Sequence, residues 1–108
     1  MSAAVAAAVA ATVLPAGPAR AAGLLPCGPL PAACVWSGPD ATGVPGILVF
    51  PEAFLIPPVV SGENRSDQPW CLFEEPFFTG SGIDFGPGET IRALPFPARS
   101  AAPGECPG

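Results

Sequence analysis

The residues best suited to chemistry are four cysteines, Cys27, Cys34, Cys71 and Cys106. An even number of cysteines in a short exported chain is typical of two disulfide bonds. The alternative is a structural zinc site, which usually needs close Cys-x-x-Cys pairs or histidine, and this sequence has neither. We therefore expect two disulfides. Four cysteines allow three pairings, and the sequence alone does not separate them.

Histidine, lysine and tyrosine are absent from the chain. Without histidine there is no Ser-His-Asp or Cys-His arrangement, and without lysine there is no Schiff base or phosphate-binding P-loop. Glu74 and Glu75 form one pair of adjacent carboxylates. Neighbouring residues on a strand point to opposite faces, however, so this pair cannot act together on one substrate. We expect no enzyme, no catalytic residue and no cofactor.

Charge and composition narrow the class of protein further. Four basic residues against nine acidic ones give a net charge of -5, which argues against binding to nucleic acid. The 108 residues include 17 Pro and 13 Gly, a content at which disorder is one alternative. Seven Phe, two Trp and the four cysteines favour instead one small domain stabilised by disulfides.

The N-terminal stretch has the layout of a secretory signal. Ala3 to Leu14 is an apolar run of 12 residues, too short for a membrane-spanning helix, and small residues follow at Ala19 and Ala21. We expect residues 1–21 to be a signal peptide, leaving residues 22–108 as a secreted, extracellular protein without a membrane anchor. No basic residue precedes the run, so either translation starts upstream of Met1 or the segment has another role, such as an Ala-rich buried helix.

A repeat divides the rest of the chain. The ten residues Cys34–Gly43 align without a gap on Cys71–Gly80 at a shift of 37 positions, and Cys, Pro, Thr and Gly coincide. The same shift pairs Glu52 with Glu89. We interpret residues 27–66 and 67–108 as two related halves of one domain. Chance similarity within a Pro- and Gly-rich chain is the alternative.

Short apolar runs bounded by Pro, Gly, Asp and Ser predict strands, and no stretch predicts a helix. The segment between positions 53 and 60 contains Ile56-Pro57-Pro58, which restricts it to an edge. The expected strands are Ala33–Trp36, Gly46–Phe50, Ala53–Val60, Trp70–Phe73, Gly82–Phe85 and Glu89–Leu94. The predicted fold class is all-β.

The second half resembles a known family. Phe73-Glu74 followed by Phe78-Thr79-Gly80 is similar to the crystallin signature, whose glycine adopts a backbone angle open to few other residues. The cysteine two residues before Phe73, the later Gly86–Glu89 and the leader resemble the small secreted metalloproteinase inhibitors of streptomycetes. The first half departs from the signature, with Ser37 in place of the acidic residue and Ala41 in place of the second aromatic.

This resemblance implies a small Greek-key sandwich of two crystallin-like halves, with disulfides Cys27–Cys34 and Cys71–Cys106. It also implies an actinobacterial, monomeric inhibitor of a secreted metallo- or serine protease. The alternatives are an extracellular structural or binding module of the cell envelope, and a small toxin. Crystallin-type domains often bind calcium, but Pro97–Ser100 has no carboxylate, and Glu63, Asn64 and Asp67 lack the required spacing, so we expect no metal site.

An inhibitor needs an exposed segment that is ordered before it binds. Two segments are candidates: Gly62–Trp70, which joins the halves, and Ala53–Val60, whose Phe54, Leu55 and Ile56 could fill an apolar subsite. The sequence does not choose between them, and the alternatives are an ordinary linker and a buried edge strand. Asn64-Arg65-Ser66 matches the N-glycosylation pattern, but the Lys-free composition suggests a bacterial source, so we assign it to the linker.

Overall fold

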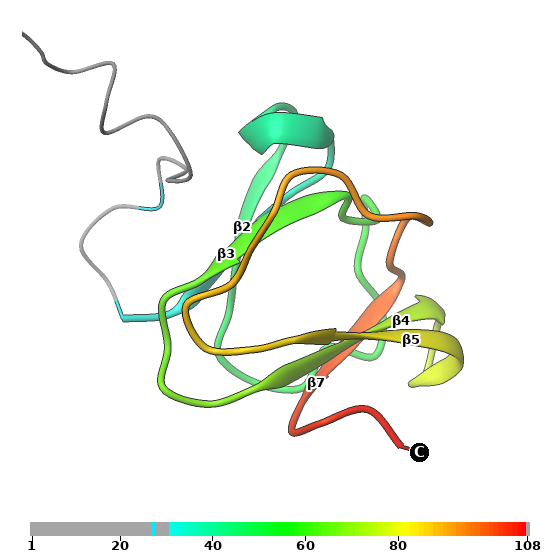
Figure 1. Ribbon diagram of the computed structural model, residues 1–108. Helices are drawn as coiled ribbons and strands as arrows, with labels where there is room; N and C mark the ends of the chain where they lie inside the picture. Colours follow the sequence, from blue (N-terminus) through cyan, green and yellow to red (C-terminus); the bar gives the residue numbers. More distant parts are fainter. Residues whose placement is uncertain (1–26, 28–30, 108) are drawn as a thin grey trace, which may run out of the picture.

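The computed structural model describes residue 27 and residues 31–107 (Figure 1). The expected signal peptide lies outside these residues. Strands dominate and form two antiparallel sheets, so the all-β prediction is confirmed. Sheet A has the order β2-β1-β3-β6, and sheet B has the order β5-β4-β7. The elements are β1 (Ala33–Trp36), η2 (Pro39–Ala41), β2 (Pro45–Leu48), β3 (Ser61–Asn64), β4 (Trp70–Glu75), β5 (Thr79–Phe85), β6 (Thr90–Ile91) and β7 (Ser100–Pro103).

Each sheet also pairs with a segment from the part of the chain that forms the other sheet. The short strand β6 follows β5 in sequence but pairs with β3 of sheet A. In the opposite direction, Glu52 follows β2 but forms an antiparallel bridge with Ala101 of β7 in sheet B. Val59 forms a second bridge, to Ala98. The two sheets are therefore joined by backbone hydrogen bonds as well as by side-chain packing.

The main core lies between the sheets and follows from the alternation of side chains along strands. Val35 of β1 and Leu72 of β4 point inward, whereas Cys34 and Phe73 point to the outer faces and are also buried. A second, smaller cluster covers the outer face of β1 and contains Cys27, Cys34 and Trp36. The main cluster consists of Ala33, Val35, Leu48, Val59, Trp70, Leu72, Phe85, Leu94, Ala98 and Ala101.

The connection between β4 and β5 folds back on itself. Phe77 and Phe78 have positive φ angles of 58° and 62°, and Gly80 has 81°. A left-handed backbone conformation is unfavourable for residues other than Gly, Asn and Asp. Other contacts must therefore stabilise this conformation at Phe77 and Phe78. The hydroxyl of Ser100 does so: it accepts a hydrogen bond from the Phe78 amide at 2.9 Å and donates one to the Glu75 carbonyl at 2.6 Å.

The connection between β1 and β2 has the same construction. Asp40, Ala41 and Gly43 have positive φ angles of 52°, 60° and 82°. Ser61 Oγ accepts from the Ala41 amide at 3.0 Å and donates to the Gly38 carbonyl at 2.6 Å. The backbone of this first hairpin therefore follows the same path as that of the second, although Ala41 stands in place of the signature's second aromatic residue. Ser61 bonds to backbone atoms, so its contacts do not depend on an aromatic side chain at position 41.

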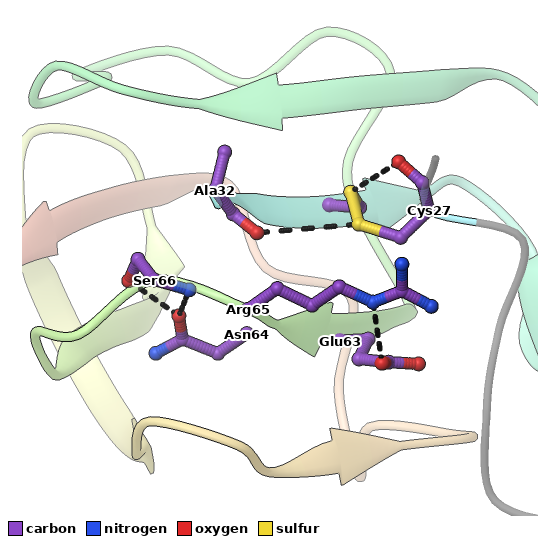
Figure 2. Close-up of a disulfide and its surroundings, with 7 residues drawn as sticks. Cys27, Ala32, Glu63, Asn64, Arg65 and Ser66 are labelled. Carbon is purple, nitrogen blue, oxygen red and sulfur yellow. Dashed lines mark hydrogen bonds and ion pairs between the residues drawn. A yellow bond between two sulfur atoms is a disulfide. The ribbon is translucent and has the colours of Figure 1, made fainter. Parts of the chain in front are cut away.

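Two disulfides join Cys27 to Cys34 and Cys71 to Cys106. These are the pairs that the family resemblance implied. Figure 2 shows Cys27 lying against β1, so this bond ties the preceding chain to the outer face of sheet A. The second bond fixes the C-terminal segment over β5, where a Cβ atom on Gly82 would lie 2.9 Å from Cys71 Sγ and 3.0 Å from Cys106 Sγ.

Several predicted strand boundaries need correction. β1 has the predicted bounds, but β2 begins one residue earlier and ends two earlier, and β6 covers only two of the six residues from 89 to 94. Residues 53–60 are not a regular strand, because their hydrogen bonds to the second sheet are interrupted. β3 and β7 were not predicted, since Ser61–Asn64 and Ser100–Pro103 contain no aromatic or β-branched residue. The short helix η2 was also not predicted.

We predict that replacing either hairpin serine by alanine destabilises the fold. Ser61→Ala and Ser100→Ala each leave a backbone donor and acceptor without their partner, so each should lower the free energy of unfolding by about 1–3 kcal/mol. Urea denaturation measures this effect. Ser81→Ala, at an exposed position of β5, is the matched control and should change stability by less than about 0.5 kcal/mol. Equal effects in all three variants would contradict the anchoring role.

Gly82→Ala should weaken the second disulfide, because its Cβ would overlap both sulfur atoms. We expect free thiols after oxidative refolding, or a loss of about 2 kcal/mol or more in the oxidised protein. Gly86→Ala is the control, since its Cβ would meet its nearest neighbour at 3.8 Å. Thiol titration and denaturation of both variants provide the measurement. Full oxidation and unchanged stability of Gly82→Ala would refute this packing.

Candidate functional site

The candidate segment Gly62–Trp70 is exposed only in its middle, at Asp67 and Gln68. Gly62–Asn64 belong to β3 and are buried, and Trp70 is the first, buried residue of β4. Only residues 65–69 connect the two strands. The linker assignment of Asn64 is therefore wrong, because this residue lies in a central strand of sheet A.

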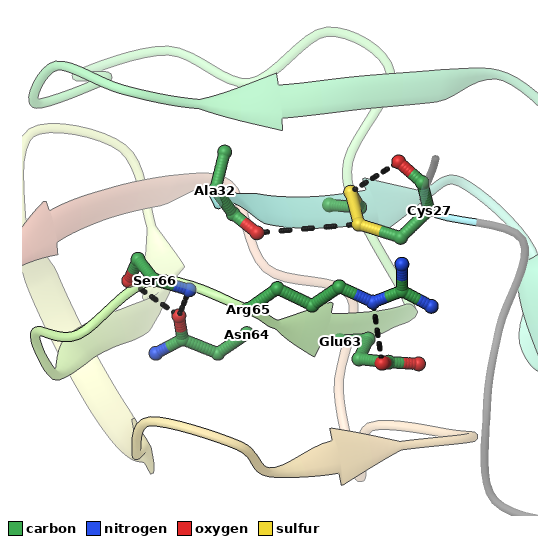
Figure 3. Close-up of polar contacts among 7 residues, drawn as sticks. Cys27, Ala32, Glu63, Asn64, Arg65 and Ser66 are labelled. Carbon is green, nitrogen blue, oxygen red and sulfur yellow. Dashed lines mark hydrogen bonds and ion pairs between the residues drawn. A yellow bond between two sulfur atoms is a disulfide. The ribbon is translucent and has the colours of Figure 1, made fainter. Parts of the chain in front are cut away.

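Asn64 organises this connection with its side-chain amide. Nδ2 donates to the carbonyl oxygens of Gln68 and Phe85, both at 2.9 Å, and Oδ1 accepts the Ser66 amide at 3.0 Å. Figure 3 shows Ser66 turned back onto Asn64, while Arg65 extends to Glu63, with 2.7 Å between Nε and Oε2. The side chains of Asn64, Arg65 and Ser66 therefore bond within or next to this connection. These contacts stabilise the path of the chain between β3 and β4.

The second candidate segment is exposed and apolar. We name residues 49–57 the apolar loop. Within it Phe50 is 71% exposed, Phe54 56% and Ile56 79%, and Val49 is also exposed. Several large apolar side chains that are this exposed and close together in the sequence are typical of interaction sites.

Backbone hydrogen bonds hold the apolar loop at Glu52 and Leu55 and just beyond its C-terminal end. The Glu52 amide donates to the Ala101 carbonyl at 2.8 Å, and the reverse bond is 2.9 Å. The Leu55 amide donates to the Arg99 carbonyl at 2.8 Å, and just beyond the loop the Val59 amide donates to the Ala98 carbonyl at 3.0 Å. The loop thus has no regular strand structure, yet its path is set by the neighbouring sheet.

Residues from two other elements extend this surface. Phe77 is 63% exposed, its ring lies 5.5 Å from that of Phe54 in an edge-on arrangement, and its amide donates to the Ala53 carbonyl at 2.9 Å. Val44, which precedes β2, is exposed and lines the same cleft as Phe54. Ile47 is also exposed, but it is paired opposite Cys34 and therefore lies on the outer face of sheet A. We name this set the apolar face: Val44, Val49, Phe50, Phe54, Ile56 and Phe77. Val44 and Phe77 were not predicted as functional residues, and the unusual Phe77-Phe78 pair was the one sequence signal for them.

A cleft of about 200 Å³ opens in the apolar face between β2 and the apolar loop. The buried core residues Val35, Leu48 and Val59 line it, together with Leu55 and Ile56. Gly46 lies on its β2 side, where a Cβ atom would touch Val35 at 3.4 Å. Glu52 is the one titratable residue among those lining the cleft. An opening of this size suits a single side chain better than a cofactor.

The other predicted site residues lie in the hairpin between β4 and β5. Phe73 packs edge-on against Phe78 with ring centres 6.0 Å apart, and Gly80 has the positive φ angle expected of the signature glycine. Glu74 is half-buried and Glu75 is exposed at the end of β4. Within the described residues, no group of three Cys, Asp or Glu side chains is arranged to hold a metal ion, and no helix is long and apolar enough to cross a membrane.

Asn64→Ala should destabilise the domain, because the buried Phe85 carbonyl and the half-buried Ser66 amide would each lose a hydrogen-bond partner. We expect the free energy of unfolding to fall by about 2–3 kcal/mol. Asp67→Ala, at an exposed position of the same connection, should change it by less than about 0.5 kcal/mol. Chemical denaturation of both proteins tests this, and similar stabilities would show that Asn64 does not organise the connection.

No protein-family model matches the sequence, and no curated protein is significantly similar to it. The resemblance to secreted inhibitors thus stays a prediction. The apolar face, with its ordered loop and its cleft, is the feature of the described residues best suited to a function.

Proposed function

We propose that this protein is a secreted inhibitor of an extracellular metallo- or serine protease, and that it contacts its target through the apolar face. The observation that carries the proposal is the apolar loop, which exposes Phe50, Phe54 and Ile56 while its backbone is bonded to sheet B. Because the loop is ordered before binding, little conformational entropy is lost when a partner closes over it. Aromatic side chains are also the most frequent energetic anchors of protein interfaces.

A crystallin-like Greek-key classification is part of this proposal, and the repeated hairpins support it. Positions 40 and 41 have the same left-handed backbone as positions 77 and 78, which is the 37-residue shift found in the sequence. Ser61 and Ser100 anchor the two hairpins in the same way. The exchange of β6 and of Glu52 between the sheets supports a pairwise, symmetric arrangement of the two halves.

Secretion is supported by the two disulfides, since such bonds persist in oxidising compartments. A domain of this size buries a modest fraction of its surface, so covalent links contribute much of its stability. In this proposal residues 1–21 direct export and are then removed.

A binding module of the cell envelope without inhibitory activity is the second candidate. It is favoured by the breadth of the apolar face, which includes Val44 before β2, the apolar loop and the hairpin at Phe77. A substrate-like inhibitor needs one protruding segment, whereas a broad face fits a flat partner. The two candidates share the surface and differ in the partner.

Titration of the refolded, oxidised protein against secreted proteases separates these candidates. The panel includes a thermolysin-like zinc protease and a subtilisin-like serine protease. We expect stoichiometric loss of one activity, and a decrease in affinity of about tenfold or more for Phe54→Ala or Ile56→Ala. Asp67→Ala, in the connection between β3 and β4, is the matched control and should inhibit normally.

The outcomes of this titration are distinct. Inhibition lost in Asp67→Ala but kept in Phe54→Ala and Ile56→Ala would move the reactive segment to the connection after β3. No inhibition at micromolar excess would reject the inhibitor proposal and favour the binding module. Thermal denaturation of each variant verifies that an altered activity does not reflect unfolding.

A further inference from the structure

We propose that the cleft beside Glu52 is a subsite for a basic side chain, arginine or lysine, presented by the partner protein. The inference rests on the proposed function in that a protein partner carries the cation. The alkyl stem of the side chain would contact the apolar walls, and its charged end would lie at the Glu52 carboxylate. Long basic side chains commonly combine these two kinds of contact.

The pairing of Glu52 fixes the side of the sheet on which its carboxylate lies. Residues directly opposite one another in an antiparallel pair have their side chains on the same side. Glu52 is opposite Ala101, which is fully buried in the core between the sheets. The Glu52 side chain therefore points toward the space between the sheets, at the edge where the cleft opens, and it is half-buried.

The Glu52 carboxylate has no counter-ion in the described part of the chain. Two described arginines bind other carboxylates: Arg65 binds Glu63, and Arg92 binds Asp40. Arg99 is the third described arginine, and its guanidinium donates to the Glu74 carbonyl at 3.2 Å. A cation for Glu52 must therefore come from outside the described residues.

Charge favours the same occupant. The chain carries nine acidic and four basic residues, so its field attracts a cationic partner surface. A neutral apolar side chain would fill the cleft but leave the carboxylate partly desolvated without compensation. A divalent metal ion is a poorer fit, because Glu52 is the one carboxylate lining the cleft.

NMR titration of the isotope-labelled protein tests the subsite with small probes. The n-butylguanidinium cation has the alkyl stem and charge of arginine, and butan-1-ol has a similar stem without charge. We expect n-butylguanidinium to shift the amide signals of Gly46, Leu48, Glu52 and Leu55, and to bind more tightly than butan-1-ol at equal ionic strength. Added salt should weaken the binding of the cation and leave that of the alcohol unchanged.

Glu52→Gln should reduce the affinity for n-butylguanidinium by about three- to fivefold without affecting butan-1-ol. Glu105→Gln is the matched control: this exposed residue precedes Cys106, over the opposite edge of sheet B from Glu52, and its change should affect neither probe. The inference is refuted by equal affinity for the two probes, by unchanged affinity in Glu52→Gln, or by signal shifts elsewhere than at the cleft. The comparison of n-butylguanidinium with butan-1-ol uses the unaltered protein, so this part of the test does not depend on whether a variant folds.

The two proposals fail in different experiments. A protein that binds n-butylguanidinium at Glu52 but inhibits no protease would refute the inhibitor function and keep the cation subsite. A protein that inhibits a protease but binds both probes equally would keep the function and refute the subsite.

Discussion

The structure depends above all on the backbone hydrogen bonds between residues 52–59 and residues 98–101. These bonds join the connection after β2 to sheet B. In the opposite direction, β6 follows β5 of sheet B but pairs with β3 of sheet A. They cover an edge of sheet B that would otherwise be unpaired. They also fix Phe54 and Ile56 on the surface, so the same contacts that complete the fold present the apolar face.

A small domain can expose this many apolar side chains only if its stability comes from elsewhere. Cys34 and Cys71 occupy corresponding positions on β1 and β4, and each is joined to a segment that covers the outer face of its sheet. Ser61 and Ser100 hold left-handed turns that side-chain packing alone would not stabilise. Covalent and polar links thus supplement the core and leave the apolar loop available for contact.

Sequence patterns predicted the parts of this fold that have strong local signals. Ala33–Trp36 has the predicted bounds because it combines apolar residues with a clear turn on each side. β3 and β7 were missed because serine, glycine, alanine and glutamate become strand residues here through pairing with distant segments. One candidate segment, Ala53–Val60, lies in the apolar face, but Val44 and Phe77 join it only through tertiary contacts. The disulfide pairs followed from family resemblance and not from spacing.

The proposed function requires that the apolar loop has one conformation before any partner binds. Backbone ¹⁵N relaxation of the free, oxidised protein measures this directly at Phe54, Leu55 and Ile56. If the hydrogen bonds to residues 98–101 order the loop, the order parameters at these positions should match those of β4, at about 0.85. Values below about 0.6 would show a flexible loop and contradict the account.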